Sequence, residues 1–175
     1  MVFLKGGQVW VESVLYTLII LSIIGVLLAF VRPKIEESRD RIIIEQSIKV
    51  LEEIDQVIEN IGGPGNQRIM IIKVGKGSLN IDSEQDIIYF RMETKSPYSE
   101  YGEEVNIGKI MVVTRKIGSN NEVTLISNYS RGYNLLYKNS DEVGRITKSS
   151  NPYKIFISNI NETQSKKNIN IEAII

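Results

Sequence analysis

The feature that most constrains this chain is an uninterrupted apolar run near its N-terminus. Residues 14–31, VLYTLIILSIIGVLLAFV, are eighteen consecutive positions without a charged side chain. As an α-helix rising about 1.5 Å per residue, the run would be roughly 27 Å long, close to the hydrocarbon core of a bilayer. A surface helix of a soluble protein has one polar face, and this run has none. The run therefore predicts a membrane-spanning helix rather than the core helix of a soluble domain.

Composition excludes several classes of function. Lysine plus arginine and aspartate plus glutamate both number 21, so the net charge is zero, and no basic stripe favours binding of nucleic acid. The chain has no cysteine and no histidine, which removes disulfides, cysteine nucleophiles and serine–histidine catalysis. We find no paired catalytic carboxylates, phosphate-binding glycine loop or metal-ligand motif. We therefore expect neither an enzyme nor a cofactor or metal.

The segment in front of the apolar run has the features of a short leader. Residues 1–7, MVFLKGG, carry one basic residue, Lys5, and end in two glycines. A secretory signal has a shorter apolar core followed by a small-residue cleavage site, whereas this apolar run is followed by Arg32, Pro33 and Lys34. We therefore expect the apolar helix to stay on the protein.

This arrangement resembles the class III signal peptide of archaeal type IV pilins and archaellins. The resemblance rests on Lys5-Gly6-Gly7, on Gln8, and on Glu12 before a long apolar helix, so it covers only the N-terminal third. It implies that a prepilin peptidase cleaves between Gly7 and Gln8, with Lys5 as the basic residue of the leader. It also implies that Glu12, the fifth residue after cleavage, pairs with the terminal amine of a neighbouring subunit during self-assembly.

Physical chemistry gives Glu12 two possible roles. A carboxylate deep in a bilayer costs about 2–3 kcal/mol and normally has a specific partner, which favours a role in assembly. Alternatively, Glu12 lies at headgroup level, where the N-terminal end of the helix dipole favours an anion.

The helix is expected to continue beyond the membrane. Pro33 removes one backbone hydrogen bond and predicts a kink, not an end. The residues after Pro33 form an apolar stripe at steps of three and four, with charged residues on the opposite face. This stripe is expected to pack on the folded domain, and a coiled coil is the alternative. The stripe consists of Ile44, Ile48, Leu51, Ile54, Ile58 and Ile61. The charged face is expected to carry Glu36, Arg39, Asp40, Glu45, Lys49, Glu52, Glu53 and Glu59.

The sequence from residue 67 onward has the two-residue alternation of β-strands. Strands are expected at residues 68–74, 78–81, 87–94, 105–117, 122–127, 133–137, 144–147, 153–159 and 168–174. The predicted fold class is therefore α+β, with an antiparallel β-rich head, either a sandwich or a curled sheet. The expected parts are a leader (1–7), a helix (8–61, with 9–31 in the membrane and 32–61 amphipathic), a hinge (62–66) and the head (67–175).

Three weaker signals lie in the head. Asn128 and Asn161 begin N-glycosylation sequons, although such triplets also arise by chance in a chain rich in asparagine and serine. The acidic residues at 82–86 favour a solvated hairpin turn over a calcium loop, because they lack the spacing of a known calcium loop. Residues 96–104, SPYSEYGEE, are expected to form an exposed acidic loop, with a contact surface as the alternative.

The resemblance to archaeal pilins, together with the apolar helix, implies a subunit, major or minor, of an archaeal type IV pilus-like filament, with its helix in the cell membrane and its head outside the cell. The partners would be the bilayer, the prepilin peptidase and other copies of the chain. The alternative is a single-pass membrane-tethered binding or accessory domain that does not polymerise; a surface enzyme is a further rival. Basic residues beyond the helix favour a cytoplasmic head by the positive-inside rule, whereas the sequons and the resemblance favour an external one.

Overall fold

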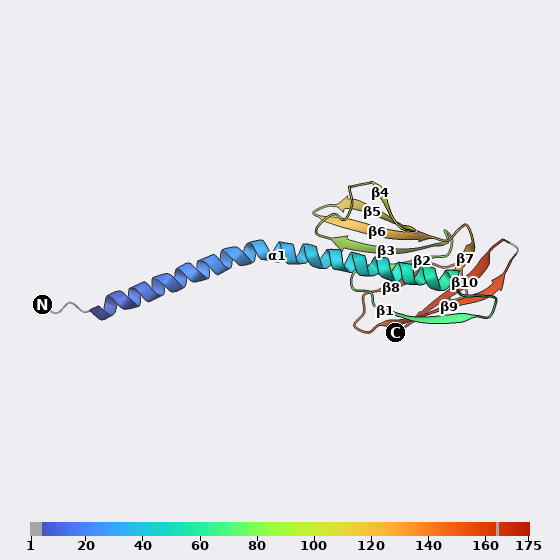
Figure 1. The fold of residues 1–175 in the computed structure, drawn as a ribbon, viewed down its shortest axis with the longest axis horizontal. Helices are drawn as coiled ribbons and strands as arrows, with labels where there is room; N and C mark the ends of the chain where they lie inside the picture. The colour runs from blue at the N-terminus through green and yellow to red at the C-terminus, as the bar shows by residue number, and fades with distance from the viewer. Residues whose placement is uncertain (1–4, 164) are drawn as a thin grey trace. The chain divides into compact units, whose positions relative to one another are not determined.

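The computed structural model describes the backbone of residues 5–163 and 165–175, and the side chains of these residues from Trp10 onward. It consists of one long N-terminal helix followed by ten strands in two sheets (Figure 1). The predicted α+β class is therefore confirmed. The chain divides into two compact units, Met1–Arg39 and Asp40–Ile175, and we describe each one by itself.

Helix α1 (Lys5–Glu59) runs through both units and contains Pro33 in its interior. The helix therefore continues past this proline, as the sequence predicts. Its last residue is Glu59, two residues before the predicted end, and Gly62 follows with a positive φ of 78°. Glycine adopts this left-handed conformation without the steric cost that a Cβ would bring, which explains the turn after the helix.

Four strands form the first sheet of the second unit, in the order β1-β9-β10-β7. They are β1 (Gln67–Ile72), β9 (Tyr153–Glu162), β10 (Lys167–Ile174) and β7 (Tyr133–Tyr137). The β1–β9 and β9–β10 pairs are antiparallel, but β10 and β7 are parallel. The predicted antiparallel arrangement is therefore incomplete, because β10 lies next to β7 and runs in the same direction.

Six strands form the second sheet, in the order β4-β5-β6-β3-β2-β8. They are β4 (Glu104–Ile107), β5 (Ile110–Ile117), β6 (Asn120–Asn128), β3 (Ile87–Thr94), β2 (Ser78–Asp82) and β8 (Gly144–Thr147). The single strand predicted at residues 105–117 is wrong. Ile107 pairs with Ile110 across a two-residue turn, in which Gly108 has a φ of 60°. Glycine at the first turn position is typical of tight hairpins, and it divides residues 105–117 into β4 and β5.

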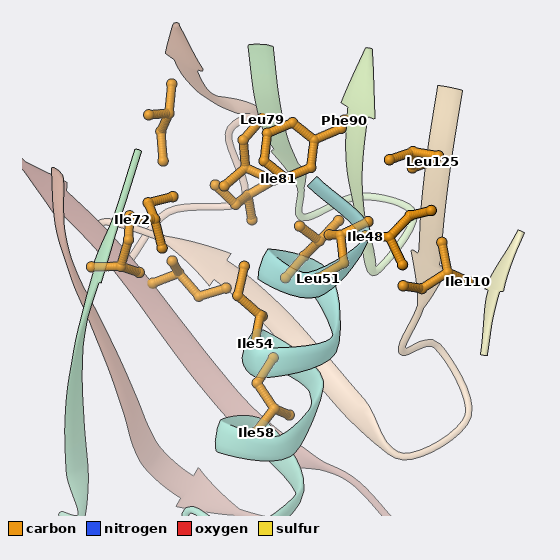
Figure 2. Close-up of a cluster of buried hydrophobic side chains, with 14 of the residues drawn as sticks. Ile48, Leu51, Ile54, Ile58, Ile72, Leu79, Ile81, Phe90, Ile110 and Leu125 are labelled. Carbon is orange, nitrogen blue, oxygen red and sulfur yellow. The ribbon is translucent and has the colours of Figure 1, made fainter. Parts of the chain in front are cut away.

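The core of the second unit lies between the sheets and the part of α1 after Asp40. All six residues of the predicted apolar stripe are buried, so this prediction is confirmed. Figure 2 shows Ile48, Leu51, Ile54 and Ile58 projecting from α1 among side chains of the strands. The labelled strand residues are Ile72, Leu79, Ile81, Phe90, Ile110 and Leu125. Helix and sheets thus bury apolar faces that neither could bury alone.

Asp40 contradicts the predicted charged face of the helix, because its side chain is buried. Its Oδ1 accepts a hydrogen bond from Lys76 Nζ at 2.5 Å, and its Oδ2 accepts one from the backbone N–H of Lys95 at 2.8 Å. A buried carboxylate needs such partners to offset the loss of hydration. Asp40 therefore attaches α1 to the segments that follow β1 and β3.

Candidate membrane-spanning and assembly helix

The described part of the first unit is a helix whose apolar side chains, from Trp10 onward, are all accessible. No side chain from Trp10 to Glu36 is buried. Within Trp10–Glu59, an 18-residue window has a mean hydropathy of 2.8 and no buried residue. Among the described residues, this is one helix that is long and apolar enough to cross a membrane, and a signal sequence would have the same properties. Apolar surface of this extent in contact with water is unfavourable, so it requires an apolar environment.

The threonine and serine hydroxyl groups within the apolar run form hydrogen bonds to the helix backbone. Thr17 Oγ1 donates to the carbonyl oxygen of Ser13 at 2.8 Å, and Ser22 Oγ donates to that of Leu18 at 2.7 Å. Bonds of this kind let a hydroxyl enter a bilayer without an unpaired donor. Apart from the adjoining backbone of the helix, no atom lies within 4 Å of the position that a Cβ on Gly25 would occupy, so the helix surface is open there to a neighbouring helix.

Glu12 is the only acidic residue of the described helix before the apolar run. Its side chain is exposed, and it has no ion-pair partner among the described side chains. The residues predicted for leader cleavage lie just before it: α1 begins at Lys5 and includes Gly7 and Gln8, and the side chain of Gln8 is not described. Residues 1–4 of the predicted leader lie outside the described residues. The cleavage site and the role of Glu12 stay predictions.

Charged residues beyond the apolar run are partly paired along the helix. Lys34 Nζ lies 2.9 Å from Glu37 Oε2, and Arg41 Nε lies 3.3 Å from Glu45 Oε1. All four side chains are largely exposed, so these ion pairs stabilise the helix only slightly. Acidic and basic residues therefore alternate along this part of the helix.

The two sequon asparagines are exposed on the second unit. Asn128 ends β6, and its Oδ1 accepts hydrogen bonds from the backbone N–H and the Oγ of Ser130, at 2.9 and 2.7 Å. Asn161 lies near the end of β9, where Thr163 Oγ1 donates to the carbonyl oxygen of Lys166 at 2.9 Å. Both side chains are accessible to a modifying enzyme, and their modification stays a prediction.

The acidic residues at 82–86 form a hairpin turn. Asp82 Oδ1 accepts hydrogen bonds from the backbone N–H groups of Glu84 and Gln85, both at 3.1 Å. Asp86 is buried, and its carboxylate binds Lys166 Nζ at 3.0 Å and the backbone N–H of Leu135 at 2.8 Å. These carboxylates are therefore engaged in structural contacts, and the described residues contain no group of three or more acidic, histidine or cysteine side chains suited to a metal ion.

A polar cluster that the sequence did not reveal lies at the end of α1, with Tyr129 buried and Lys109 and Glu59 exposed. The Tyr129 hydroxyl donates a hydrogen bond to Asp55 Oδ1, and Lys109 Nζ pairs with Glu59 Oε1. Burial is the main cause that raises the pKa of both Tyr129 and Asp55. The cluster lines a cavity of about 120 Å³ whose charges are mixed. It connects α1 to the β4–β5 turn and to the segment after β6, which is a packing role.

The chain matches no protein-family model, no curated protein and no solved structure. The fold and the apolar helix therefore carry the functional argument without support from a relative.

Proposed function

We propose that this protein is a structural subunit of a type IV pilus-like surface filament, anchored and assembled through its N-terminal helix. The observation that carries the proposal is the combination of a fully accessible apolar helix with a folded β-rich unit that shares the same helix. The leader-like residues 1–7 and Glu12 support it through their resemblance to archaeal pilins.

The proposed mechanism has two stages, both driven by the apolar surface of α1. The helix first holds the precursor in the bilayer, where Leu, Ile, Val and Phe each contribute roughly −0.3 to −0.6 kcal/mol to insertion. After a prepilin peptidase has removed the leader, the helices of several copies pack side by side, and protein replaces lipid around each helix. The open surface at Gly25 would allow close approach of two helices.

Glu12 would fix the register of this packing. A carboxylate within an apolar bundle is costly unless it has a cationic partner, and the new terminal amine of a neighbouring copy is such a partner. Packing without this pair would leave the carboxylate unpaired, so only the paired register is stable. The head would face the outside of the cell, where Asn128 and Asn161 would be glycosylated.

Substitution of Glu12 tests this proposal against a simple membrane tether. We expect Glu12→Ala to insert into membranes normally but to lose incorporation into sheared surface filaments by at least tenfold. Glu36→Ala, which removes an exposed charge farther along the same helix, is the matched control and should assemble normally. Equal filament yields for wild type and Glu12→Ala would exclude the proposed role. A chain absent from filaments in every variant would support the tether.

A further inference from the structure

One surface that the proposed function leaves unexplained is the loop 96–104, here called the acidic loop. Its backbone is fixed to β5: Ser99 N donates to Thr114 Oγ1 at 3.2 Å, and Gly102 N donates to the carbonyl oxygen of Thr114 at 2.9 Å. The Tyr101 hydroxyl donates to Asn121 Oδ1 at 2.9 Å. These bonds give the loop one defined conformation, so little conformational entropy would be lost on binding a partner.

The acidic loop presents both apolar and negatively charged groups to solvent. The side chain of Tyr101 is 51% exposed although its hydroxyl is bonded. Glu100, Glu103 and Glu104 are exposed, and none of them has an ion-pair partner among residues 10–163 and 165–175. An open hollow of about 760 Å³ is lined by residues of this loop, among them Pro97 and Tyr98. Exposed tyrosines are typical of binding surfaces.

A second unexplained surface lies on the outward side of the four-stranded sheet, here called the isoleucine face. Ile69, Ile71 and Ile174 are 60%, 65% and 55% exposed. The strand register aligns Ile69 with Phe156, and places Ile71 and Ile174 on either side of Lys154. Because alternate residues of a strand share one side, these side chains project away from the core. The result is an exposed apolar patch on β1, which is an edge strand, and on the neighbouring strands of the same sheet.

The charges around the isoleucine face are mainly positive. Lys154 within the face and Lys73 just after β1 are exposed, and neither has an ion-pair partner among the described residues. The acid on this side, Glu172, accepts a hydrogen bond from Asn170 at 2.9 Å. The isoleucine face therefore complements the acidic loop in composition, because it combines apolar and basic groups where the loop combines tyrosines and glutamates.

We propose that the acidic loop of one copy of this chain binds the isoleucine face of the next copy. The loop leads into β4, at one edge of the six-stranded sheet, whereas β1 is at an edge of the other sheet, and Figure 1 shows them on opposite sides of α1. Each copy can then use both surfaces at once. Such a head-to-tail contact continues from copy to copy, as a filament requires. The inference rests on the proposed function and adds the contact between heads.

The absence of cysteine makes this contact directly testable in the full-length protein. We would co-express two single-cysteine chains, Tyr101→Cys and Ile71→Cys, and treat intact filaments with a mild oxidant and with a short bis-maleimide. We expect a cross-linked dimer only when both variants are present. The matched control combines Ile117→Cys with Ile71→Cys, because Ile117 is as exposed as Tyr101, at 50%, but lies outside the acidic loop. This pair should give at most one tenth of the dimer.

Charge reversal provides an independent readout in the same cross-linking pair. Adding Lys73→Glu and Lys154→Glu to the Ile71→Cys chain should lower the dimer yield at least tenfold. Adding Glu100→Lys and Glu103→Lys to the Tyr101→Cys chain should then restore the yield. Lys49→Glu with Lys148→Glu, two exposed lysines that belong to neither surface, is the control that should leave the yield unchanged.

Three outcomes would overturn the inference. The first is filaments without the expected dimer. The second is a dimer formed by Ile71→Cys alone, which would indicate that two isoleucine faces contact each other. The third is protection of the cysteine at position 71 from a water-soluble thiol reagent in membranes that hold dispersed copies, which would indicate that lipid covers this face. Filament content of the chain is measured separately. Filaments without the cross-link would reject this contact and leave the proposed function standing, whereas absence of the chain from filaments would reject the proposed function and this contact with it.

Discussion

The second half of α1 should be indispensable for folding of the β-rich unit. Six aliphatic side chains of the helix and the residues just after it are buried against the sheets. Burial of one such side chain contributes about 1.5–3 kcal/mol. For six side chains this is roughly 9–18 kcal/mol, and even a reduction of up to about 40% for residual structure in the unfolded chain leaves several kcal/mol. The total stability of a domain is only about 5–15 kcal/mol.

Truncation tests this estimate. A chain of residues 40–175, which is the second compact unit, should show a cooperative urea transition by circular dichroism and fluorescence. A chain of residues 62–175, which lacks the buried stripe, should show no cooperative transition. Addition of a peptide of residues 40–61 should restore it. A cooperative transition of residues 62–175 alone, with the same midpoint as the longer chain, would refute the argument that helix and sheets share one core.

Three substitutions test other parts of the fold. Leu51→Ala should lower the free energy of urea unfolding by about 2–5 kcal/mol, because it leaves a cavity in the core. Gly144→Ala should cost about 1–3 kcal/mol, since its Cβ would lie 2.4 Å from the Tyr137 ring, whereas Gly132→Ala, with no atom within 4 Å, should cost less. Tyr129→Phe should cost about 1–3 kcal/mol at neutral pH by removing the hydrogen bond to a partly buried carboxylate. Because folding raises the pKa of Tyr129 above its ordinary 10.0, the wild type should also lose stability as the pH rises beyond 10, and Tyr129→Phe should lose less.

The helical and strand periodicities predicted most of the elements because they are local signals. The stripe on α1 needed only the three- and four-residue spacing of its apolar residues, and all six are buried. The residues of 105–117 alternate as one strand would, and only the turn-forming conformation of Gly108 divides them. The parallel pairing of β7 with β10 depends on how distant segments return to one sheet, which no local pattern encodes.

The apolar helix was predictable, whereas the polar contacts that fix it to the head were not. Residues 14–31 predict a membrane-spanning helix by themselves, since an uncharged run of this length is typical of such helices. In the sequence, Asp40 cannot be distinguished from a charged residue on a helix surface, because its partners Lys76 and the backbone of Lys95 are distant in the chain. Tyr129 and Asp55 are 74 positions apart in the chain, so their hydrogen bond has no signature in sequence.

The central claim is that the apolar helix is kept after leader removal and then joins copies of the protein. Intact-mass and N-terminal analysis of the chain from native surface filaments tests it most directly. The account predicts a chain that begins at Gln8, retains residues 14–31 and carries any additional mass on Asn128 or Asn161. Native protein that still begins at Met1, or that ends its N-terminal processing beyond residue 31, would contradict the account.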